Sequence, residues 1–187
     1  MAKDPHKPEY WKTTSEKVFH TTPWAEFVER KFVRQDGENG TYTFLRTPGA
    51  IGVVPIDKDN NVILHKQYRY LFESWDWEIF GGGMNKGEEH EAAARRELQE
   101  ETGVTDPELE FVGEYEPANA LVDETNYLYV WKNAEIDESF AGDPLEPVSD
   151  YLRVPLEEVP VWLASQQTRD GFSITGLLFA YGYLTKA

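Results

Sequence analysis

Short apolar runs separated by polar turns dominate the central part of the chain. Residues 50–56 and 62–68 are rich in β-branched residues and are joined by the polar segment 57–61. Runs of this length and composition predict two buried strands and a turn. Residues 126–131 alternate between aromatic and aliphatic side chains, which predicts a strand with a different face on each side. Further strands are predicted at residues 75–80, 109–116 and 151–154.

Three segments have the composition of helices. Residues 82–104 open with glycines, which predict a turn, and continue with strong helix formers and no proline; Gly103 stands where such a helix should end. Residues 155–165 predict a helix with a proline at its first position, and residues 173–185 predict a closing helix. The acidic segment 135–150 contains glycine and prolines and therefore predicts a loop.

An aromatic segment precedes the central strands. Residues 26–34 and 41–46 are strand-like and are separated by a polar turn, which predicts a β-hairpin after a loosely held tail at residues 1–14. The hairpin region carries many aromatic residues for a peripheral element: Trp24, Phe27, Phe32, Tyr42 and Phe44. The hairpin is therefore expected either to cover the core or to form a dimer interface.

Composition narrows the range of partners. The 187 residues carry a formal net charge of −16, which argues against binding to nucleic acid or anionic membrane, because both need a basic surface. The chain has no cysteine, which excludes disulfides, zinc thiolates and thiol nucleophiles. The polar N-terminus does not resemble a signal peptide and no apolar run is long enough to span a bilayer, so we expect a cytoplasmic protein.

The helix predicted within residues 82–104 concentrates carboxylates on one face. Glu97, Glu100 and Glu101 fall at positions i, i+3 and i+4, where like charges cost about 0.2–0.5 kcal/mol per pair. A cluster of hard oxygen ligands on a rigid element is, however, a good site for Mg²⁺ or Mn²⁺. The alternative for three glutamates alone is an exposed, solvated helix face.

The spacing of the whole stretch is more specific than the three glutamates. Gly82 is followed after five residues by Glu88, and after seven more by residues 96–104, which read Arg-Glu-Leu-Gln-Glu-Glu-Thr-Gly-Val. This pattern resembles the Nudix box, the signature of hydrolases that act on nucleoside diphosphates linked to another moiety. Its specified positions are filled by Gly82, Glu88, Arg96, Glu97, Glu100, Glu101 and Gly103.

The resemblance implies an α/β fold, the Nudix α/β/α sandwich, in which a mixed sheet lies between helices. The local pattern of strands and helices agrees with it. Residues 48–187 would then form the hydrolase domain, and residues 1–47 would form an N-terminal extension with a tail and a β-hairpin. Relatives use such an extension to dimerise and to complete the substrate site, so a homodimer is expected.

The resemblance also implies roles for the residues of the box. Glu97, Glu100 and Glu101, with the backbone carbonyl of Gly81, would hold Mg²⁺ or Mn²⁺. Glu100 and Arg96 also count among the catalytic candidates, and Arg96 is expected to orient a glutamate or the turn. Glu88 would stabilise the turn.

Two segments outside the box resemble the ADP-ribose pyrophosphatase branch. Residues 67–69 match the Q-Y-R that precedes the box in that branch, so Arg69 either pairs with an acid or holds a phosphate or a terminal ribose. Pro117 and Glu124 match a downstream loop whose carboxylate serves as a base or an extra metal ligand, although the serine and glycine of that loop are replaced. Glu124 is therefore the candidate base with Asp123 as the reserve, and an exposed loop acid is the alternative.

The strand before the box departs from the family pattern. Where relatives have E-(L/I)-P-A-G, residues 78–82 read Glu-Ile-Phe-Gly-Gly, which leaves the stiffness of the turn and the geometry of the Gly81 carbonyl open. Phe80 and Trp24 are candidates for stacking on a nucleobase, although aromatic residues this common are more often part of a core.

Together these features predict a metal-dependent hydrolase of nucleoside diphosphate sugars, with ADP-ribose as the first candidate. The reaction needs charge neutralisation on the phosphates, an oriented water and a group that accepts its proton. The alternatives are a hydrolase of RNA caps or nucleoside triphosphates, a non-catalytic nucleotide sensor of the same fold, and a metal-buffering acidic protein. A sensor is expected to have a broken box, and this box is intact.

Overall fold

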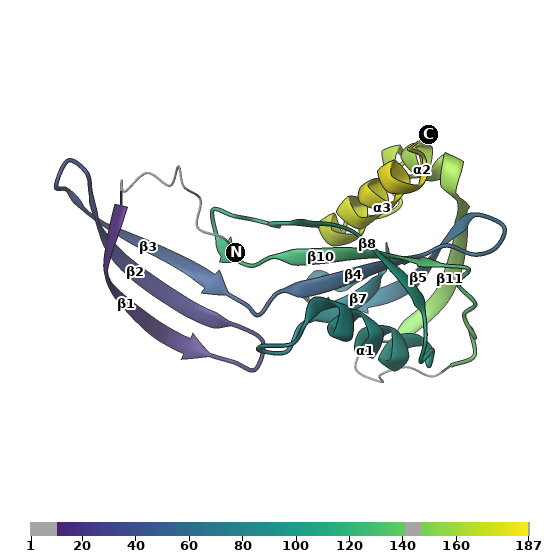
Figure 1. Ribbon diagram of the computed structural model, residues 1–187, viewed down its shortest axis with the longest axis horizontal. Helices are drawn as coiled ribbons and strands as arrows, with labels where there is room; N and C mark the ends of the chain where they lie inside the picture. The colour runs from purple at the N-terminus through teal and green to yellow at the C-terminus, as the bar shows by residue number, and fades with distance from the viewer. Residues whose placement is uncertain (1–10, 141–146, 187) are drawn as a thin grey trace. The chain divides into compact units, whose positions relative to one another are not determined.

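The computed structural model describes residues 11–140 and 147–186 (Figure 1). These residues form two compact units. The first comprises the described residues up to Pro48 together with Ala118–Glu124, and the second comprises Gly49–Pro117 together with the described residues from Thr125 onward. None of the described helices is both long and apolar enough to cross a membrane.

Two sheets form the frame of the second unit (Figure 1). The first is mixed, with the strand order β7 (Phe80–Gly83), β4 (Ala50–Pro55), β10 (Asn126–Lys132) and β8 (Glu108–Tyr115). Its central strands β4 and β10 are parallel, and the outer strands pair with them in antiparallel fashion. The second sheet is antiparallel, with the order β11 (Val148–Pro155), β5 (Asn61–Arg69) and β6 (Ser74–Glu78). A short 3₁₀ turn, η1 (Tyr70–Phe72), joins β5 to β6.

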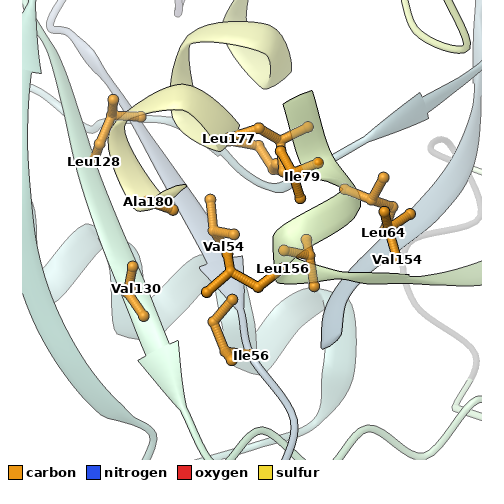
Figure 2. Packing of buried hydrophobic residues seen from close by; sticks show 12 residues of the cluster. Val54, Ile56, Leu64, Ile79, Leu128, Val130, Val154, Leu156, Leu177 and Ala180 are labelled. Atoms are coloured by element: carbon orange, nitrogen blue, oxygen red, sulfur yellow. The ribbon is translucent and has the colours of Figure 1, made fainter. Parts of the chain in front are cut away.

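Helices α1 (His90–Thr102) and α3 (Gly171–Leu184) lie on opposite faces of the mixed sheet (Figure 1). The side chains of alternate residues in β4 point to opposite faces of the mixed sheet. Ile51 and Val53 pack in one apolar cluster with Ala93, Ala94 and Leu98 of α1. Val54 packs in the other cluster, with Leu177 and Ala180 of α3 (Figure 2). A core on each face of a mixed sheet confirms the predicted α/β/α sandwich.

The glycines before α1 form a strand and not the predicted turn. Gly81 pairs with Gly52 and Gly82 with Ile51 across β7 and β4. Gly81 has a φ of +136°, and a Cβ atom there would lie 2.0 Å from the Ile51 carbonyl oxygen, so only glycine fits. The turn follows at residues 84–89, and the strand predicted at residues 75–80 is divided between β6 and β7.

Prolines and a cap set the boundaries near the C-terminus. Pro155 ends β11, whereas it was expected to open a helix. The 3₁₀ turn η2 (Leu156–Glu158) comes first, and Pro160 then occupies the first turn of α2 (Val159–Ala164), where its missing N–H costs no helical hydrogen bond. Asp170 caps α3 by accepting hydrogen bonds from the N–H groups of the helix's first turn.

The first unit is a sheet of β1 (Trp11–Thr21), β2 (Glu26–Arg34) and β3 (Asn39–Arg46), with the short parallel strand β9 (Val122–Asp123) beside β3. The pairing of β2 with β3 confirms the predicted hairpin. Residues 11–14, expected in a loose tail, belong instead to β1, where Trp11 stacks on Phe32 with ring centroids 4.5 Å apart. Residues 1–10 of that tail lie outside the described residues.

A histidine on β5 is buried in the second unit. His65 is 1% exposed, and its ring meets the Phe80 ring edge-on with centroids 4.5 Å apart. Burial lowers the pKa of His65 to about 4, and the positive charge of Arg69 acts in the same direction. His65 is therefore neutral in the folded chain at neutral pH, whereas an exposed histidine titrates near pH ~6.5.

The fold should consequently lose stability on acidification between about pH 6.5 and about pH 4, because the unfolded chain there binds a proton at His65 that the folded chain does not. From pH 7 to pH 5 this group should lower the free energy of unfolding by about 2 kcal/mol. Urea denaturation at both pH values should show a pH-dependent loss smaller by that amount in His65→Leu. An unchanged pH dependence in His65→Leu would contradict the assignment.

Candidate active site

Helix α1 brings two of the predicted acids onto the backbone of β7. Glu101 Oε2 accepts a hydrogen bond of 3.0 Å from the Gly81 N–H. The Glu97 carboxylate lies directly against Gly82, where a Cβ atom would be 2.6 Å from its Oε2. A side chain at residue 82 would therefore displace Glu97. Glu100, the third acid of the face, is more open to solvent, with a side chain that is 57% exposed.

The guanidinium group of Arg96 forms hydrogen bonds with three acids of the box, Glu88, Glu97 and Glu100. Its Nε and Nη2 donate to the two carboxylate oxygens of Glu88 at 2.9 and 3.0 Å. Its Nη1 donates to Glu97 at 2.6 Å and to Glu100 at 3.2 Å. Nη2 also donates to the Gly83 carbonyl at 3.0 Å. Arg96 thus lies where it orients glutamates and the glycine strand.

These contacts favour the charged forms of Glu88 and Arg96. The Arg96 hydrogen bonds, helped by the backbone N–H of Asn85, lower the pKa of Glu88 to about 2. Glu88 in turn raises the pKa of Arg96 above its ordinary value. Four glutamates and one arginine therefore leave a local formal charge of −3 at neutral pH.

The donor set fits a divalent cation in its chemistry. Glu97 and Glu101 offer carboxylate oxygens and Gly81 offers a backbone carbonyl, all hard ligands of the kind that Mg²⁺ and Mn²⁺ prefer. Within the described ranges, no three acidic or histidine side chains stand close enough together to hold an ion as they are placed. Glu97 is paired with Arg96 and Glu101 with the Gly81 N–H, so binding of an ion competes with these contacts.

Phe80 does not offer a surface to a nucleobase, which overturns its candidacy for stacking. Its side chain is 0% exposed and packs in the core beneath α1. Phe80 stands where the family pattern has a proline, and it opens β7, where its pairing with Val53 holds the backbone that leads to Gly81. The departure from the family pattern is therefore compensated by strand pairing.

Arg69 forms a fork with a buried acid. Its Nε donates to both oxygens of Glu78 at 2.9 and 3.0 Å, and its Nη2 also donates to Glu78. Burial raises the pKa of Glu78, and Arg69 opposes that rise. The Arg69 side chain remains 46% exposed and lines a pocket of about 310 Å³. Both expectations for Arg69, pairing with an acid and exposure to a ligand, are thus compatible.

Three other candidates belong to the first unit. Glu124 accepts a hydrogen bond of 2.6 Å from the Thr47 hydroxyl. Asp123 pairs with Arg46 at 3.5 Å. Trp24 is 75% exposed. The catalytic and substrate-binding roles of these residues stay predictions.

Two residues of the second unit escaped the sequence analysis. Asn85 donates to Glu88 through its backbone N–H at 2.8 Å and its side-chain amide at 3.1 Å. An asparagine in a turn, three residues before a glutamate, is a signal that could have pointed to this contact. Arg169 lines the same pocket as Arg69, and no local pattern in the sequence connects these two arginines.

A family model described as NUDIX domain matches residues 46–172 of the chain. The CMP-5'-(N-acetyl-N-hydroxy-3-aminopropyl)phosphonate hydrolase of Streptomyces rubellomurinus is 26% identical over 174 residues, which cover 92% of this chain and 82% of the relative. The ADP-ribose pyrophosphatase of Bacillus subtilis is 27% identical over 135 residues, which cover 72% and 73%. A crystal structure described as that of an ADP compounds hydrolase shares the fold, with a TM-score of 0.77 and 23% identity over 94% of this chain and 95% of that one.

A divalent ion should stabilise the folded chain through Glu101. Mg²⁺ at about 100 times its Kd should raise the free energy of unfolding by about 2.7 kcal/mol, which corresponds to a rise in Tm of about 5–10 °C. Glu101→Gln should show much less of this rise, because a neutral amide is a poorer ligand than a carboxylate. Tm is measured by circular dichroism with and without MgCl₂. Glu91→Gln, on the exposed side of α1, is the matched control and should respond as the wild type does. Equal Mg²⁺ responses in Glu101→Gln and the wild type would refute the ligand assignment.

Proposed function

The chain belongs to the NUDIX domain family, and from that premise we propose that it hydrolyses the pyrophosphate bond of a nucleoside diphosphate sugar. ADP-ribose is the leading substrate, and the products are a nucleoside monophosphate and a sugar phosphate. The proposal rests on the convergence of Glu97 and Glu101 on the Gly81–Gly82 backbone beside the Arg96 cluster. The broader activity, hydrolysis of a phosphoanhydride bond, is borne out by the family match and the relatives.

The names of two relatives support the substrate class. One describes a hydrolase of CMP attached to a phosphonate, and the other describes an ADP-ribose pyrophosphatase. Both names describe a nucleotide that carries a further group. The net charge of −16 gives no support to the alternative of an RNA substrate. A nucleotide sugar is therefore the substrate class that we favour.

The residues of the site have different roles in the proposed hydrolysis. Glu97 and Glu101, with the Gly81 carbonyl, would hold Mg²⁺ or Mn²⁺, which supplies charge neutralisation on the phosphates and a bound water of lowered pKa. Arg96 keeps Glu97 and Glu100 in position, and Glu88 holds Arg96.

Residues outside the box complete the proposed chemistry. Glu124 accepts the proton of the attacking water, with Asp123 as the reserve. Arg69, whose side chain is 46% exposed, contacts the far phosphate or the sugar. Trp24 stacks on the base, since its ring is exposed and apolar.

We also propose that the chain acts as a cytoplasmic homodimer that pairs through its first unit. That unit exposes large apolar side chains: Trp11, Val18, Phe19, Trp24, Phe27, Tyr42, Leu45 and Leu121. Exposed apolar surface of this extent supports an interface. The absence of cysteine is compatible with a reducing compartment.

A panel of substrates tests the proposed activity. With Mg²⁺ present, kcat/KM for ADP-ribose or another nucleotide sugar should exceed that for a nucleoside triphosphate by at least about tenfold, because the triphosphate lacks the sugar. Arg69→Ala should raise KM most for the sugar-linked substrate. Glu101→Gln, folded by circular dichroism, should keep less than about a tenth of the wild-type turnover.

Light scattering on the same preparations gives the mass in solution. A preference for the triphosphate, or a monomer with full activity, would contradict the ADP-ribose branch and leave the family membership intact. Substantial turnover in Glu101→Gln would contradict the role of the metal-binding face.

The role of the base is tested separately. Glu124→Gln should lower kcat by about 100-fold or more while changing the Mg²⁺ affinity little, because general-base catalysis contributes roughly 10²–10⁴-fold. Initial rates give kcat, and a Mg²⁺ titration of Tm gives the affinity. A loss of Mg²⁺ affinity that matches the loss of rate would make Glu124 a metal ligand. An unchanged rate would move the role to Asp123.

A further inference from the structure

A pocket of about 310 Å³ lies along one face of β6, within the second unit. Ser74, Asp76 and Glu78 alternate along this strand and therefore point to the same face. Three other elements complete the wall: Arg69 of β5, Phe72 of η1, and Arg169 to Gly171 at the start of α3. The pocket thus combines acids, arginines and one aromatic ring.

Most of the polar groups in this wall are already engaged. Asp76 accepts hydrogen bonds from the N–H groups of Trp77 at 2.9 Å and Arg169 at 3.1 Å. Asp170 is used as the cap of α3, and Arg69 is paired with Glu78. The carboxylates therefore have fixed orientations before any ligand arrives.

Arg169 is the exception. Among residues 11–140 and 147–186 its side chain forms no ion pair, and its hydrogen bond from Nη2 to Ser74 Oγ is long, at 3.4 Å. A guanidinium group has five N–H donors in a planar fork. Arg169 is therefore the donor of the wall with the most capacity left for a ligand.

The charges and the size of the pocket define the ligand that it suits. Asp76, Glu78 and Asp170 outnumber the two arginines, so the wall has a formal charge of −1 and does not favour an anion. A neutral ligand with several hydroxyl groups suits it better, because each hydroxyl can donate to a carboxylate and accept from a guanidinium.

The shape points to the same ligand. Phe72 is 78% exposed and offers the apolar face of its ring. The volume of about 310 Å³ lies within the range of roughly 300–1,000 Å³ for small-molecule sites, so the pocket has room for a sugar ring.

The pocket adjoins the acid cluster along the chain. Glu78 precedes Gly81 by three residues, and three residues span at most about 10 Å. The first turn of α3 packs on the same part of the sheet from the face opposite α1, because a Cβ atom on Gly52, the partner of Gly81, would lie 2.9 Å from the Phe172 ring. The link from the pocket to the acid cluster is therefore the backbone from Glu78 to Gly81, and a ring held beside Glu78 has the backbone of Gly81 within reach of its attached phosphate.

We propose that this pocket binds the uncharged, hydroxyl-bearing ring of the non-nucleotide half of the substrate, and that Arg169 determines specificity by donating to the ring hydroxyls. The inference rests on the proposed function and adds to it the part of the substrate that is selected. Arg169 contacts the ring itself, so its removal should act on binding of sugar-bearing substrates and spare those without a sugar.

Steady-state kinetics with two substrates test this role. One is ADP-ribose, and the other is ADP with a methyl ester on its β-phosphate, which has the same pyrophosphate and no sugar. Arg169→Ala should lower kcat/KM for ADP-ribose by about 10–100-fold, mainly through KM, because a charged hydrogen-bond donor is lost. It should leave kcat/KM for the methyl ester within about twofold. Arg153→Ala, an exposed and ion-paired arginine of the same unit, is the matched control and should affect neither substrate.

A binding measurement that needs no turnover separates this inference from the proposed function. Saturation-transfer NMR with D-ribose should detect binding to the wild type and to Arg153→Ala, and a much weaker signal with Arg169→Ala. Inorganic phosphate should not displace the ribose. If neither nucleotide substrate is hydrolysed but ribose binds through Arg169, the proposed function fails and the pocket assignment stands.

Three results would overturn the inference while leaving the proposed function in place. They are equal losses on both substrates in Arg169→Ala, wild-type kinetics for ADP-ribose in that variant, and displacement of ribose by inorganic phosphate, which would make the pocket an anion site. Circular dichroism of each variant confirms that the fold is intact.

Discussion

Glu97 and Glu101 reach the backbone of β7 only because residues 81 and 82 have no side chains. A Cβ atom on Gly81 would collide with the Ile51 carbonyl oxygen at 2.0 Å, and one on Gly82 would lie 2.6 Å from the Glu97 carboxylate. The same two glycines therefore allow β7 to pair with β4 and α1 to pack against β7. The buried side chain of Leu98 then fixes the rotation of α1, so that Glu97 and Glu101 face the glycines. A side chain at residue 81 would disturb the pairing with β4, and a side chain at residue 82 would displace the Glu97 carboxylate.

In this acidic chain, single arginines form ion pairs with several carboxylates and so reduce the repulsion between them. Arg96 contacts three glutamates of the box, and in the first unit Arg46 contacts Glu16, Glu26 and Asp123. Around Arg96 the balance is still negative, with a formal charge of −3. That excess attracts a divalent cation, and it repels a pyrophosphate in the absence of one. In the proposed function, this charge would link substrate binding to metal binding.

The elements of secondary structure that are determined by residues close together in the sequence could be predicted. The helix of the box, its end at Gly103 and the two faces of β10 follow from local periodicity, and the Nudix resemblance is confirmed by the family match. The glycines at 81–83 were expected in a turn. They form a strand instead, because they pair with β4, about 30 residues earlier in the chain, and no local sequence pattern indicates that pairing. The sequence left Phe80 open between stacking on a base and packing in the core, and its burial beneath α1 decides for the core. The pocket unites β5, β6 and the start of α3, which no sequence pattern connects.

The two arginines of this pocket have the same chemistry and different dependence on the fold. Glu78 is buried, and burial raises its pKa, so its charged form depends on the guanidinium of Arg69. Loss of Arg69 would leave a buried acid without that partner, which costs stability as well as binding. We therefore expect the effect of Arg69→Ala on KM to be accompanied by a loss of stability. Arg169 is exposed and holds no buried acid, so a change there acts on the ligand first. Arg69, in the motif at residues 67–69, stabilises the wall of the pocket through Glu78. Arg169, outside that motif, forms no such pair with a buried acid.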